Sequence, residues 1–121
     1  MTIENCYQTL GGDYQDVRSR IPSDALIKRF IGAFLSDPSF AALESAASAG
    51  DRKAAFSAAH TLKGVCANLG FGKLYQSASR LTELLHPEAD ALPDGTAALL
   101  EAVRQGYRSA VDTIGAFLSA Q

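Results

Sequence analysis

Long apolar runs, tryptophan and a basic leader are all missing from this chain of 121 residues. No stretch approaches the roughly 20 consecutive apolar residues that a membrane-spanning helix requires. The first residues include Glu4 and Asn5, so they lack the basic start and apolar core of a secretory signal. The sequence therefore predicts a cytoplasmic protein that does not associate with membranes.

Cysteine is scarce, and an excess of positive charge is absent. Cys6 and Cys66 lie far apart in the sequence and form no C-x-x-C pair, which excludes a redox or metal framework and favours buried free thiols. The formal net charge is −2, so a general nucleic-acid-binding role has no support in the composition.

What the chain does contain is enough apolar material for one folded domain. Hydrophobic residues make up 47% of the chain and charged residues 20%. This balance can bury a core and is unlike that of disordered segments. A length of 121 residues fits a single domain, which we expect to span residues 1–121.

Apolar residues recur at helical spacing between turn signals, and no segment alternates as a strand does. Proline and glycine punctuate this pattern, so that one helix should end before Pro38, the next at Gly50 and another at Gly70. We expect helices over residues 24–36, 38–49, 51–69, 71–86 and about 95–119, with a loop at Pro87–Pro93.

The segment GGD at residues 11–13 is typical of a turn followed by a helix N-cap. Tyr14, Val17 and Ile21 predict a short helix that follows this turn and lies across one end of the bundle. Burial of all these apolar stripes predicts an all-α fold. The expected architecture is an antiparallel four-helix bundle, with a core of about residues 24–119 and one or two additional N-terminal helices.

One histidine faces away from the expected core. On a helical wheel of residues 51–69, His60 lies opposite an apolar stripe formed by Ala55, Ala58, Leu62, Val65 and Leu69. The residues that share its face are Lys53, Phe56, Lys63, Gly64 and Ala67. A lone outward histidine on a helix commonly has no function, so its neighbours decide whether it has one.

Those neighbours give His60 a chemical context. Lys63, one turn on, can hold an anionic group that arrives on the imidazole. Gly64 has no Cβ, so a partner can approach closely, and a glycine inside a helix costs about 1 kcal/mol relative to alanine.

Charge is also unevenly distributed. Residues 51–86 carry five basic and two acidic side chains, a net charge of +3, whereas the segments on either side are negative. This favours docking against an acidic pocket or a phosphorylated group, although a chance excess of lysines on a solvated face would give the same pattern.

The segment AAHTLKG at residues 58–64, followed by ANLG at residues 67–70, resembles the signature of histidine-containing phosphotransfer (HPt) domains. The similarity is tight over about residues 50–85, and LGGD at residues 10–13 resembles the opening of the family. The family motif H-x-x-K-G implies that His60 is phosphorylated and that Lys63 and Gly64 belong to the site. Many members have small polar residues after that glycine, whereas this chain has Val65 and Cys66, which the wheel places toward the core.

The resemblance implies a histidine phosphotransfer protein of a two-component phosphorelay. His60 would accept a phosphoryl group from the aspartyl phosphate of one receiver domain and pass it to another receiver. A neutral imidazole is a nucleophile that needs no activating base, and Lys63, together with Lys53, can neutralise charge in a loose transition state.

By the same resemblance the chain is a phosphocarrier and not an enzyme with its own ATP-dependent kinase activity. It binds no cofactor or metal itself, because the Mg²⁺ and the aspartate belong to the receiver domain. The implied partners are response-regulator receiver domains and a hybrid histidine kinase, and the resemblance favours a monomer.

The imidazole should also be oriented by the neighbouring helix. A hairpin folded about residues 70–71 places His60 opposite about Leu81, so the polar residues in reach are Ser79, Arg80 and Thr82. We favour Thr82 as the orienting residue, although each of the three could equally be part of a solvated surface.

Four residues are expected to contact a partner: Thr82 from the neighbouring helix, and Lys53, Phe56 and Ala67 from the His60 face. Phe56 and Ala67 would supply apolar contact beside the imidazole, although such residues more often lie at the edge of a core. Lys53 adds positive charge to the same surface.

Other functions fit parts of the sequence. Glu83-x-x-His86 has the spacing of a di-iron ligand pair, but such sites need two of these pairs, and His86 more simply ends its helix. Gly72-Lys73 is a weak match to a phosphate-binding loop, without a preceding strand. A helical-bundle adaptor that binds signalling partners without accepting phosphate stays open, because a fold alone implies no chemistry.

Overall fold

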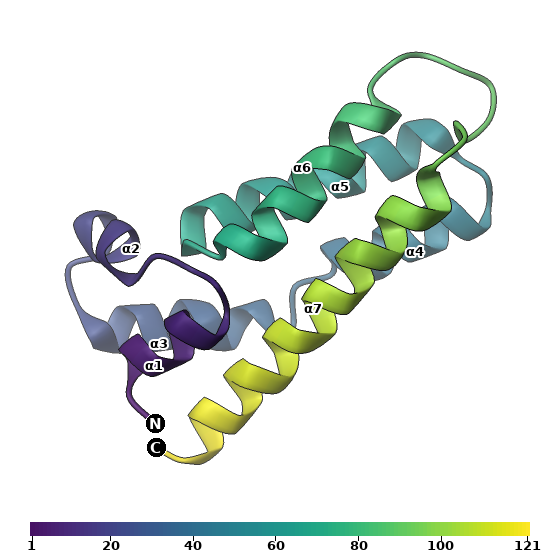
Figure 1. Cartoon of the computed structure of the whole chain (residues 1–121). Coiled ribbons are helices and arrows are strands. Elements are labelled where there is room, and N and C mark those ends of the chain that lie inside the picture. The colour runs from purple at the N-terminus through teal and green to yellow at the C-terminus, as the bar shows by residue number, and fades with distance from the viewer.

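The computed structural model describes residues 1–121 as seven α-helices without a strand (Figure 1). This confirms the all-α class and the helical bundle that the sequence predicts. None of the helices combines the length and apolarity needed to cross a membrane. Their bounds are α1 Ile3–Thr9, α2 Tyr14–Arg20, α3 Asp24–Phe34, α4 Ser39–Ser48, α5 Arg52–Leu69, α6 Gly72–Leu85 and α7 Thr96–Ser119.

Local signals in the sequence set both ends of α5, the helix that carries His60. Asp51 caps its start and accepts a hydrogen bond from the amide of Ala54 at 3.0 Å. Gly70 ends the helix in the left-handed region, with φ at 70°, a conformation that glycine adopts without steric cost. The helix therefore begins and ends where the sequence predicts.

The structure fixes two details that the sequence prediction leaves open, the first residue of α7 and the position of α1. α7 begins at Thr96, because Gly95 precedes it with φ at 92° and cannot be part of the helix. The sequence prediction also leaves α1 unplaced. In the structure Thr2 caps this helix through reciprocal hydrogen bonds with Asn5, and its buried face is short.

The helices pack around α5 in a fixed order. α5 lies between α4 and α6, and α6 packs in turn against α7. α3 and α4 share the remaining side of the bundle, with α3 against Leu118 near the end of α7 and α4 further toward its start, where Phe40 stacks on Tyr107. Figure 1 shows α7 running the length of the molecule beside both.

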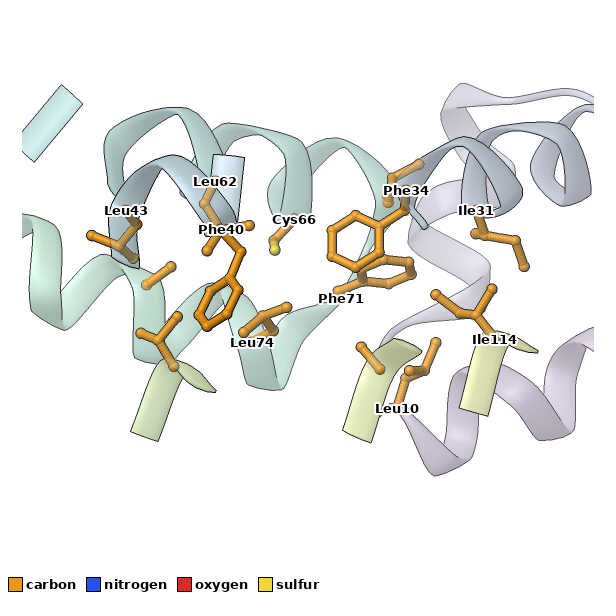
Figure 2. Packing of buried hydrophobic residues seen from close by; sticks show 14 of the residues in the cluster. Leu10, Ile31, Phe34, Phe40, Leu43, Leu62, Cys66, Phe71, Leu74 and Ile114 are labelled. Atoms are coloured by element: carbon orange, nitrogen blue, oxygen red, sulfur yellow. The ribbon is translucent and has the colours of Figure 1, made fainter. Parts of the chain in front are cut away.

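One continuous core joins all seven helices. Figure 2 shows the ring of Phe34 from α3 against that of Phe71, which precedes α6; the rings meet edge to face with centroids 5.1 Å apart. Cys66 from α5 points its sulfur into the same interior (Figure 2). Cys6 and Cys66 are both buried and free, as the sequence predicts.

α1 and α2 close the C-terminal end of α5. The Tyr7 hydroxyl donates to the carbonyl of Leu69 at 2.7 Å, and the Arg20 guanidinium donates to the carbonyls of Ala67 and Asn68, each at 3.0 Å. The last turn of a helix leaves carbonyls without helical partners, and a positive charge is favourable at its negative end. The two N-terminal helices thus hold the end of the helix that carries His60.

The turn before α2 lies directly against the turn between α5 and α6. The Asp13 amide donates to the carbonyl of Gly70 at 3.1 Å. A Cβ placed on Gly12 would lie 2.4 Å from that same carbonyl oxygen. Glycine is therefore required at position 12 by the close approach of two backbones.

We expect Gly12→Ala to lower the free energy of unfolding by about 1–3 kcal/mol, because the new methyl group has no room beside a backbone oxygen. The matched control is Gly115→Ala in α7, where a Cβ meets nothing within 4 Å. This control should gain up to about 1 kcal/mol from helix propensity. Urea unfolding followed by circular dichroism compares them, and equal stability of the two variants would contradict the close contact.

Candidate functional site

His60 points away from the core from the middle of α5. Its side chain is exposed, whereas the opposite face of the helix is buried. The residues of this buried face are Ala55, Ala58, Ala59, Leu62, Cys66 and Leu69. Because α4 and α6 cover that face, the imidazole is left on the open side of the helix, as the wheel predicts.

The interaction that the structure gives the His60 ring is an aromatic one. Phe56, one turn earlier on α5, is half-buried, and its ring lies nearly parallel to the imidazole, at 20° and with centroids 5.9 Å apart. Phe56 also meets the ring of His86 edge to face, with centroids 5.4 Å apart. The imidazole of His60 therefore lies at the end of a row of three rings.

The lysines of this face are not engaged in ion pairs. Lys53 is exposed and Lys63 is half-buried. The four ion pairs of the structure involve Arg18 and Arg20 of α2 and Arg104 of α7 instead. Both ammonium groups are therefore available to an anion that reaches His60.

The surface beside the imidazole is open. A Cβ placed on Gly64 would meet nothing within 4 Å, so nothing in the chain itself requires a glycine there. Ala67, further along the same face, is exposed and small. Because Gly64 and Ala67 have no large side chain, another protein can approach the imidazole closely on this face.

Thr82 is not on this surface, and the expectation that it orients the imidazole or contacts a partner is wrong. Its side chain is buried, only 5% exposed, and its hydroxyl donates to the carbonyl of Ala78 in its own helix at 2.7 Å. A threonine can be buried in this way because the carbonyl one turn back satisfies its hydroxyl. Ser79 is half-buried and Arg80 exposed, and neither forms a hydrogen bond with His60.

Cys66 does not compete with His60 as a nucleophile. Burial raises the pKa of its thiol to about 12, so the sulfur stays protonated at neutral pH. Val65 is half-buried and Cys66 is fully buried, which agrees with the inward positions that the wheel gives them.

The rival sites lack the surroundings they would need. Glu83 and His86 are not part of any group of three or more residues that could hold a metal ion. Gly72 begins α6 directly after the turn at Gly70, and no strand precedes it. His86 is the C-cap of α6, as the sequence predicts.

The contact between His86 and Phe56 is the part of the site that sequence analysis missed. The signal lay in the hairpin register: if His60 is opposite about residue 81, then Phe56 is opposite about residue 85, next to His86.

These features define a class of protein: a helical bundle that presents one imidazole, beside unpaired cations and an open glycine, on a single exposed helix face. The family model of the Hpt domain matches residues 36–113, more than half of the chain and including all of α5. The chain belongs to the Hpt domain family. Members are phosphocarrier modules of two-component signalling, without kinase activity, and they interact with receiver domains and kinases. No curated protein and no solved structure matches the chain.

The open space at Gly64 makes a prediction about docking. We expect Gly64→Leu to weaken binding of a receiver domain by about tenfold or more, because the leucine would overpack an interface that must close on His60. The bundle itself should be unchanged or slightly more stable, since a leucine favours the helix.

Gly115→Leu in α7 is the matched control, because a side chain there also meets nothing within 4 Å of its Cβ. Titration calorimetry with a receiver domain measures binding, and thermal unfolding measures stability. Unchanged affinity in Gly64→Leu would show that the partner does not approach this part of α5.

Proposed function

We propose that this chain is the histidine phosphotransfer protein of a phosphorelay. His60 accepts a phosphoryl group from the aspartyl phosphate of a receiver domain and later passes it to the aspartate of another receiver. The observation that carries this proposal is the exposed imidazole of His60 within the matched Hpt region, with Lys63 and Gly64 beside it on the same face.

The phosphoryl transfer needs no reactant other than His60 and the aspartyl phosphate. A ring nitrogen of His60 attacks the phosphorus, a P–N bond forms, and the P–O bond to the aspartate breaks, with its electron pair leaving on the carboxylate. The ring keeps its proton on the other nitrogen. Because the neutral imidazole is already a nucleophile, the chain needs no general base, and the reverse attack by a second aspartate returns the free imidazole.

Catalysis in such a transfer is mainly positioning and charge neutralisation. Lys63 is the residue that we expect to face the phosphoryl oxygens, with Lys53 adding positive charge to the rim. The aspartate and the Mg²⁺ that complete the site would come with the receiver domain. The phosphorelay site is therefore shared between two proteins and exists only while they are docked.

The surface around His60 fits an acidic partner. Residues 51–86 have a net charge of +3, and charge complementarity speeds encounter more than it adds affinity. Ala67 provides apolar contact beside the imidazole. Receiver domains, including one carried by a hybrid histidine kinase, are the partners that this chemistry requires.

Phosphoryl transfer to His60 is tested directly with a receiver domain that carries radiolabelled phosphate. Wild-type protein should acquire label that is labile to acid and stable to base, as expected of phosphohistidine. His60→Gln should acquire none, whereas His86→Gln, which retains the proposed acceptor, should still become labelled. If the wild type binds several receivers and stays unlabelled, the adaptor function takes the place of phosphotransfer.

Lys63→Ala should slow transfer by about threefold to tenfold, because a half-exposed cation near developing charge stabilises the transition state less than a buried one does. The effect should shrink as salt is raised. Arg108→Ala removes one exposed positive charge from α7 and serves as the control for net charge. Rapid-quench kinetics at saturating receiver measures the rate of transfer. An equal decrease of this rate in Lys63→Ala and Arg108→Ala would show that Lys63 is not part of the site.

A further inference from the structure

The row of rings formed by His86, Phe56 and His60 has no part in the phosphoryl transfer proposed for His60. Phe56 and His60 stand one turn apart on α5, so their side chains share a face. Their rings are nearly parallel, at 20°, with centroids 5.9 Å apart. Such an arrangement restricts the rotamers that the imidazole can adopt, although the imidazole itself is exposed.

Phe56 is in turn held from two sides. It is half-buried and packs against the hydrophobic core. The ring of His86 meets it at 64°, with centroids 5.4 Å apart, which is a favourable edge-to-face geometry. The phenyl ring therefore has little freedom to swing away from His60.

Arg52 fixes the segment that carries His86. Its guanidinium donates to the carbonyl of Leu85 at 2.6 Å and to the carbonyl of Ala89 at 3.2 Å. One side chain from the first turn of α5 thus ties down the end of α6 and the loop that follows it. His86 lies in the chain between these two anchored residues, and its ring contacts that of Phe56.

We propose that Phe56 is the positioning residue of the phosphorelay site, with His86 holding it from behind. This inference rests on the proposed function of His60. Phe56 takes the role that sequence analysis assigned to Thr82, and it orients the imidazole by stacking rather than by a hydrogen bond.

The contact between Phe56 and His60 should be more favourable during phosphoryl transfer than in the unphosphorylated protein. Once the P–N bond has formed, the ring still carries its proton on the other nitrogen, so it is cationic. The centre of the imidazole lies 5.9 Å from that of the Phe56 ring, within the range of about 6 Å over which an aromatic ring attracts a cation. The neutral imidazole is not attracted to the same degree. Because the contact strengthens as the bond forms, it lowers the barrier rather than only tightening the resting state.

The experiment compares Phe56→Leu with Phe56→Tyr, using two phosphoryl donors. One donor is a phosphorylated receiver domain at saturating concentration. The other is phosphoramidate, which needs no protein docking: its P–N bond breaks, ammonia leaves, and the P–N bond to His60 forms. Tyr107→Leu is the matched control, because it removes a half-buried stacked ring from α7.

We expect Phe56→Leu to slow labelling by about threefold to tenfold with both donors, since an aromatic pair is worth up to about one factor of ten. Phe56→Tyr should restore the wild-type rate, and receiver affinity should stay within about twofold in both variants. If Phe56→Leu is slowed only with the receiver, and binds it more weakly, then Phe56 is a partner contact and the proposal is wrong.

A spectroscopic readout separates this proposal from the proposed function. In the unphosphorylated protein, the ring current of Phe56 should shift the ring-proton resonances of His60, and Phe56→Leu should abolish that shift. His86→Ala should reduce it while urea unfolding stays cooperative. Should the wild type accept no phosphoryl group, the relay function fails; should the His60 resonances be the same in wild type and Phe56→Leu, the stack and its positioning role fail.

Discussion

Burial of one face of α5 between α4 and α6 is the constraint on which the site depends. That face consists largely of alanine with Leu62, Cys66 and Leu69, and small residues let the flanking helices approach closely. Because a helix has only one rotational setting that buries this face, the opposite side must carry His60 into solvent. Asp51 caps the start of α5 and Gly70 ends it, so the bounds of the helix are fixed as well as its rotation.

The exposed face of α5 carries few functional groups, as expected if a second protein supplies the rest of the site. An imidazole, two unpaired ammonium groups and an open glycine give a nucleophile, charge and room, but no cluster of carboxylates. The chain itself restricts the conformation of the His60 side chain. A row of rings from His86 through Phe56 holds an exposed side chain that would otherwise sample several rotamers.

The sequence predicts the structure correctly wherever a local signal acts alone. The cap at Asp51, the stop at Gly70 and the outward direction of His60 follow from residues within a turn or two of each position. Thr82 could not be placed in this way, because whether it lies inside or outside depends on how α6 rotates against α5, and its polar side chain suggested the wrong side. The contact of His86 with Phe56 depends on the register of two helices and on a loop that Arg52 anchors, which no single segment encodes.

The tie between the GGD turn and Gly70 has a consequence for where this domain begins. The family model matches from residue 36, yet the carbonyls at the end of α5 are satisfied by Tyr7 and Arg20, and the core continues into α1 and α2. A fragment cut at the edge of the match would leave α5 frayed at its last turn and an apolar end uncovered. The cooperative folding unit is therefore longer than the segment by which the family is recognised.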